Sequence, residues 1–284
     1  MAPKKRLILL LLALLVTIIA GFVSISAYLY TAVPAFYSPR HLTPEQTAVA
    51  AQAAEEKVIS VRNWAEHEEA IESARLHHVA TRPIEDLHVS VTDTQINAFF
   101  RKWKDVLQWD RIGDPYVSNP TLAIIGDHIV LAGEVRQMHA IVSLVFTAKL
   151  DEHGELVVRL RRVLAGRLTL PSTLWMAQRH RVVNAVEDAL PRWKREARMR
   201  ASGAANSAGV AVAMSRLLLC ALSNKPVDPV LFLPVDDRTA IPAKIDSIDI
   251  GDGRLSLKLE PMSEKERTEY WDRLIHSTGV AESF

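Results

Sequence analysis

The sequence predicts an α+β protein: an N-terminal transmembrane helix, then an antiparallel β-meander sheet covered by long helices. Three observations lead to this fold class. Residues 7–30 form a run of 24 residues without charge or proline. Apolar and polar residues alternate over residues 140–150, which is the period of a half-buried antiparallel strand. Capping patterns led by Thr43, Thr92 and Ser263 mark the starts of helices.

The run at residues 7–30 is long enough to cross a membrane, because a bilayer core needs about 20 apolar helical residues. Lys4, Lys5 and Arg6 precede it, so the positive-inside rule keeps residues 1–6 in the cytoplasm. We therefore predict a signal-anchor in the plasma (inner) membrane and an extracytoplasmic C-terminal part. The alternative is a cleaved signal peptide with a weak site at Ser24-Ile25-Ser26, although the run exceeds the usual apolar region of roughly 7–15 residues.

A long helix is predicted next, within a juxtamembrane or stalk segment at residues 31–82. Thr43, Pro44 and Gln46 supply a cap, a first-turn proline and the reciprocal glutamine. Two roles stay open for this helix: a stalk that holds the domain off the membrane, or a helix that packs across a sheet.

The predicted α+β domain spans residues 83–284. A strand at 87–91 leads into a helix, and turn signals such as Gly126-Asp127 then separate four strands. A helical insertion follows at about residues 172–224, where Pro191 should kink or break the helix. A second strand group and a last helix end the domain. The expected strands lie at residues 121–125, 128–135, 140–150, 155–163, 230–233, 243–250 and 254–260.

Composition excludes several classes of protein. The chain holds 34 basic and 33 acidic residues, a balance that argues against a nucleic-acid partner. Cys220 is the single cysteine, so no disulfide forms within the chain, and we expect it to be a small buried apolar residue. No serine elbow, phosphate-binding glycine loop or metal-ligand spacing occurs. We therefore assign no catalytic, metal or cofactor residue and expect a non-catalytic protein, with an envelope hydrolase as an alternative.

Two groups of residues are candidates for binding. The first would contact an anion such as a phospholipid headgroup, and its alternative is surface charge paired with nearby carboxylates. The second would line an apolar groove, and its alternative is an ordinary core. The anion group is Arg159, Arg161, Arg162 and Arg167; the groove group is Phe99, Trp103, Val142, Leu144, Phe146 and Trp175. Arg162 breaks the strand alternation, so it either points to the core side or marks a bulge.

Several short motifs carry a resemblance to a known family. They lie at residues 91–98 (Val-Thr-Asp-Thr-Gln-Ile-Asn-Ala), 129–135 and 165–171, with the closing hairpin at 248–259. Together with the basic start and single anchor, this chain resembles the YpmS-like family of membrane-anchored bacterial proteins, which implies no catalytic residue. A looser similarity is to tubular lipid-binding domains, where a long helix and a curved antiparallel sheet leave an apolar groove. The amount of apolar strand and helix surface, rather than either resemblance, favours binding of a lipid or other apolar envelope component, and a scaffold that holds an envelope protein partner is the alternative.

Overall fold

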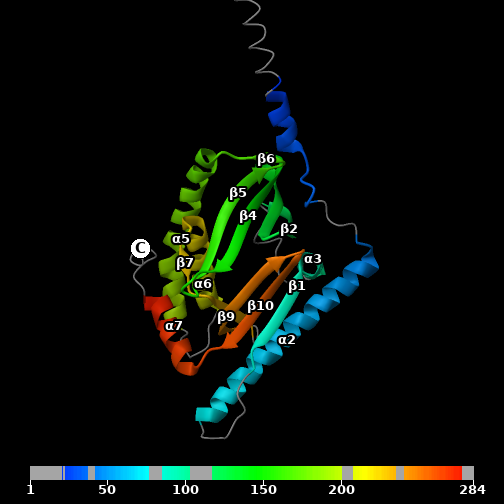
Figure 1. Ribbon diagram of the computed structural model, residues 1–284. Coiled ribbons are helices and arrows are strands. Elements are labelled where there is room, and N and C mark those ends of the chain that lie inside the picture. The colour runs from blue at the N-terminus through cyan, green and yellow to red at the C-terminus, as the bar shows by residue number, and fades with distance from the viewer. Residues whose placement is uncertain are drawn as a thin grey trace, which may run out of the picture.

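The computed structural model describes residues 21, 23–37, 42–76, 85–102, 117–199, 207–234 and 240–276. They form an α+β fold of antiparallel sheets and helices, which confirms the predicted class (Figure 1). Most of the predicted anchor, residues 7–20 and 22, lies outside the described residues, and residues 23–31 are helical. Within the described ranges, no helix is both long and apolar enough to span a bilayer.

The predicted meander is present as a sheet of antiparallel strands in the order β2-β3-β4-β5-β6, which we call the meander sheet. Tight turns join β2 to β3 and β4 to β5, as expected from the turn residues. At the opposite end, the 3₁₀ turn η1 joins β3 to β4, and Gly166-Arg167 joins β5 to β6. The elements are β2 (Val117–Ile125), β3 (His128–Val135), η1 (Arg136–Met138), β4 (Ala140–Leu150), β5 (Leu156–Ala165) and β6 (Leu168–Thr169), with β7 (Pro226–Val227) paired to β5.

A second, four-stranded sheet corrects the expectation of a single sheet. Its order is β1-β10-β9-β8, so the first strand of the domain pairs with the last, with Leu87 opposite Leu259. The pairing buries Leu259 together with Ile241, Ala243 and Ile245 of β9. The strands are β1 (Leu87–Thr92), β8 (Val230–Pro234), β9 (Ala240–Gly251) and β10 (Arg254–Pro261).

The main core lies where the two sheets and two helices meet. Leu156 of β5 and Cys220 of α6 (Ser207–Ser223) pack with the β9 residues and with Ala65 of α2 (Pro44–Leu76). The burial of Cys220 confirms its predicted role as a small apolar residue. α2 lies along the four-stranded sheet and α3 (Asp93–Lys102), as Figure 1 shows. Its buried alanines allow this close approach, and Trp64 Nε1 donates to Glu85 O at 2.8 Å.

The helical region forms a second, smaller core. Here α5 (Ser172–Met199) packs on α6, and both contact α7 (Glu264–His276). α5 continues through Pro191, so the break that proline alone favours does not occur. The buried Leu190 packs with Val212, Leu219 and Leu274. This packing offsets the hydrogen bond that Pro191 removes.

Candidate functional site

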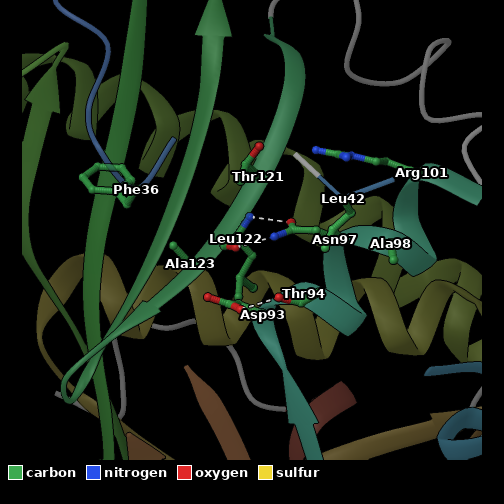
Figure 2. A pocket seen from close by; sticks show the side chains of 10 residues that line it. All are labelled: Phe36, Leu42, Asp93, Thr94, Asn97, Ala98, Arg101, Thr121, Leu122 and Ala123. Atoms are coloured by element: carbon green, nitrogen blue, oxygen red, sulfur yellow. Dashed lines mark hydrogen bonds between the residues drawn. The ribbon is translucent and has the colours of Figure 1, made fainter. Parts of the chain in front are cut away.

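α3 places polar side chains against the edge of the meander sheet. Its start is a reciprocal capping box, as predicted: Thr92 Oγ1 accepts from Gln95 N at 3.2 Å, and Thr92 N donates to Gln95 Oε1 at 2.9 Å. Asn97, near the middle of α3, donates from Nδ2 to Leu122 O at 2.7 Å and accepts from Leu122 N at 2.9 Å (Figure 2). Since β2 is an edge strand, Asn97 satisfies the backbone groups that another strand would otherwise bond.

Asp93 is a buried carboxylate beside this contact. Its Oδ1 accepts from Thr94 Oγ1 at 3.2 Å, and its Oδ2 lies 3.4 Å from Ile124 N. Its backbone N–H donates to Gly253 O at 3.0 Å, which joins α3 to the β9–β10 turn. Asp93 and Asn97 therefore serve as hydrogen-bonding links between α3 and both sheets.

A small cleft opens between α3 and β2 (Figure 2). Its volume is about 40 Å³, and Asp93, Asn97, Arg101 and Thr121 contribute its polar walls. That volume suits an ordered water molecule, whereas small-molecule pockets occupy roughly 300–1,000 Å³. The cleft therefore offers no room for a substrate.

The predicted groove residues of β4 lie on one face of the meander sheet. Val142, Leu144 and Phe146 alternate along the strand and are half-buried. Leu144 stands opposite Val163 of β5 on one side and Leu131 of β3 on the other. Val163 is buried, whereas Leu131 is 43% exposed. Burial thus decreases across the sheet from β5, on which α6 packs, to β3.

This gradient leaves an apolar surface that we call the open strip. Directly paired residues share a face of the sheet, so the open strip consists of Ile129, Leu131, Val142, Leu144 and Phe146. The other groove candidates do not join it in the described part of the chain. Phe99 lies on α3 with its ring 6.1 Å from that of Phe100, Trp175 is half-buried on α5, and Trp103 lies outside the described residues.

The four candidate arginines do not form one patch. Val145 pairs with Arg162 and Phe146 with Leu160, so Arg161 is the extra residue of a bulge. Of the two alternatives predicted at Arg162, the bulge is therefore confirmed. Arg161 Nε donates to Thr147 Oγ1 at 3.2 Å, and Arg159 Nε is buried without a hydrogen bond. Arg167 lies beyond the end of β5. Because a strand rises about 3.3 Å per residue, the length of β5 between Arg159 and this end is about 20 Å.

Arg167 instead belongs to a joint between the meander sheet and the helix at residues 23–31. Its backbone N–H donates to Leu29 O at 2.7 Å, and its Nε donates to Val33 O at 2.9 Å. The last carbonyls of a helix lack partners within the helix and favour cations nearby. Arg167 supplies both donors and positive charge at this helix end.

Gly166 makes the close approach at this joint possible. Its φ is +59°, and a Cβ at this position would overlap the Tyr30 carbonyl oxygen and lie 2.5 Å from Leu29 O. Tyr30 Oη also donates to Met138 O of η1 at 2.8 Å. The joint therefore consists of the Gly166-Arg167 turn, η1 and the end of the helix at 23–31. The sequence gives no signal for it, because its parts lie far apart in the chain.

The segment after this helix packs on the face of the meander sheet opposite the open strip. Phe36 contacts Val130 and Val145, and Val145 alternates with Leu144 of the open strip. Tyr37 is buried, and its Oη donates to Asn119 O at 2.9 Å and lies 3.4 Å from Glu134 Oε1. Burial, and then the neighbouring Glu134 carboxylate, raise the pKa of Tyr37 to about 12.

No family model, curated protein or solved structure matches this chain. The resemblance to the YpmS-like family therefore stays a prediction. Within the described ranges, no group of three or more His, Cys, Asp or Glu side chains gathers where it could hold a metal ion.

Proposed function

We propose that the protein is a single-pass, membrane-anchored protein whose extracytoplasmic domain binds the apolar part of a lipid or another envelope component without catalysis. The anchor is residues 7–30, which Lys4, Lys5 and Arg6 orient with the N-terminus in the cytoplasm. The observation that carries the binding role is the open strip, above all the exposed Leu131 on an interior strand.

The energetics favour an apolar ligand on this face. Each Å² of apolar surface removed from water contributes about 25 cal/mol. An acyl chain laid along the open strip would cover side chains from both β3 and β4, which lie in register. On this sheet face the exposed Leu131 adjoins the half-buried Ile129 and Leu144, and contiguous apolar surface of this kind is typical of ligand or partner sites.

The test is photo-cross-linking of the full-length protein in phospholipid vesicles that contain a lipid with a diazirine in its acyl chain. We expect labelled peptides from β3 and β4, in addition to those from the anchor. Leu131→Asp should reduce the β3–β4 labelling several-fold, because a carboxylate opposes entry of an acyl chain. Ile59→Asp is the matched control, since Ile59 is an exposed apolar residue on α2.

Labelling of the anchor alone would contradict the lipid role. The open strip would then fit the scaffold alternative, in which an envelope protein covers it. The hydrolase alternative gains nothing from the cleft in Figure 2, because that cleft is small and its Asp93 and Asn97 hold α3 in place.

A further inference from the structure

The depth of the joint in the membrane follows from the length of the apolar run. The 24 residues at positions 7–30 would span about 36 Å as a helix, against a hydrocarbon core of about 30 Å. Tyr30 would then lie within roughly 6 Å of the core, which is about the thickness of one headgroup layer. The Arg167 N–H lies 2.7 Å from Leu29 O, so the β5–β6 turn shares this depth.

No free linker separates the helix at 23–31 from the domain. Gly166-Arg167 and Met138 contact residues 29–33 directly, and Phe36 and Tyr37 continue the attachment along the sheet. In Figure 1 the helix at 23–31 leaves the body beside β6, and α5 begins at the same end. That end of the domain must therefore approach the membrane surface.

The side chains at this end fit such a surface. Met138 of η1 is 37% exposed, and Leu174 and Met176 in the first turns of α5 are 62% and 42% exposed. Arg136 and Arg167 are exposed beside them, and their guanidinium groups suit phosphate. The β4–β5 turn, at the opposite end of these strands, carries Asp151, Glu152, His153 and Glu155 instead.

We propose that the end of the domain formed by η1, the β5–β6 turn and the first turns of α5 lies in the headgroup layer of the bilayer that holds the anchor, with Met138, Leu174 and Met176 in contact with lipid. This proposal rests on the proposed membrane span. Its occupant is phospholipid rather than a protein partner, because the apolar run continues into this same surface. Of the four candidate arginines, it assigns headgroup contact to Arg167 alone.

The experiment uses the full-length protein in vesicles of phosphatidylcholine and phosphatidylglycerol in equal parts. Single cysteines at Met138 or Leu174, in a Cys220→Ala background, carry an environment-sensitive fluorophore. We expect blue-shifted emission and quenching by headgroup-proximal spin-labelled lipids. Ile59→Cys and His153→Cys are the controls, both at exposed positions away from this end, and they should be quenched several-fold less.

Alkaline extraction of the same vesicles separates the two proposals. Protein that is released by alkali has no membrane span, and the proposed function then fails. A second result would contradict only the inference about this end of the domain: the protein stays in the vesicles, but the Met138 and Leu174 probes are quenched no more than the His153 probe. The proposed anchor would then stand, whereas the contact of η1 and α5 with lipid would not. Equally strong quenching at all four positions would also contradict this inference, because the whole domain, and not one end of it, would then lie against the bilayer.

Discussion

Tyr37 shows how one residue fastens the segment after the N-terminal helix to the meander sheet. Its ring is buried, and its hydroxyl donates to the carbonyl of Asn119, a residue held at a φ of +50°. The phenol must stay neutral to donate this bond beside Glu134. Ionisation of Tyr37 would place two negative charges next to each other in a partly buried site.

We expect Tyr37 to make the protein sensitive to alkaline pH. Because its pKa rises from 10.0 to about 12 on folding, the stabilisation is complete below pH 10 and is lost as the pH rises through 12. Urea unfolding of Tyr37→Phe should show a smaller loss of stability over this range than wild type. Some loss remains, because burial also raises the pKa of Tyr270.

Ile59→Val is the control for this comparison, because Ile59 is exposed on α2 and the substitution removes no ionisable group. It should keep the alkaline profile of wild type. A Tyr37→Phe profile that coincides with wild type would show that the phenol of Tyr37 does not ionise on unfolding.

Among the helices, two capping boxes of the same design differ in the charge of the residue that closes the box. The box at α3 uses the neutral Gln95, whereas the box at α7 uses Glu266, which accepts from Ser263 N and Ser263 Oγ, both at 2.8 Å. These two hydrogen bonds hold the pKa of Glu266 below its usual value of 4.5. The contribution of the α7 box is therefore fully present above pH 4.5 and is lost as the pH falls below it, through the lowered pKa of Glu266 in the folded protein.

We expect Glu266→Gln to lose less thermal stability between pH 7 and pH 3 than wild type, because a glutamine box does not titrate. The reciprocal variant, Gln95→Glu, should add acid sensitivity at α3. Capping interactions of this type contribute about 1 kcal/mol, which calorimetric melting curves can resolve. Parallel pH profiles for wild type and both variants would contradict this assignment.

Local signals were sufficient to predict most elements but not their assembly. Gly126-Asp127 and Gly251-Asp252-Gly253 define hairpins because the paired strands adjoin in sequence. Ser90 and Ser256 also face each other, with Oγ atoms 3.0 Å apart, although 166 residues separate them. The alternation of β1 and β10 does not specify this pairing, since burial of the whole core decides it. The roles of Asn97 and Gly166 could not be predicted from the sequence for the same reason, because each contacts backbone groups that are distant in the chain.

At the scale of the whole molecule, the joint makes the domain and the N-terminal helix one body. A flexible tether would let the open strip take any orientation to the membrane. The hydrogen bonds of Arg167 and Tyr30 instead fix the helix against one end of the meander sheet. With the proposed membrane span, the open strip would be held at a constant angle to the bilayer, and a lipid could pass along it from the headgroup layer.

Gly166→Ala should break this constant orientation. Gly126→Ala is the matched control, because Gly126 has nearly the same φ, +57°, but no atom within 4 Å of an added Cβ. Both variants should lose about 1–2 kcal/mol to the left-handed backbone, but only Gly166→Ala displaces the carbonyls of Leu29 and Tyr30. Spin labels at Ala27→Cys and His153→Cys, in a Cys220→Ala background, report the orientation. Their distance distribution should stay narrow in wild type and Gly126→Ala and broaden in Gly166→Ala; a narrow distribution in all three would mean that other contacts orient the domain.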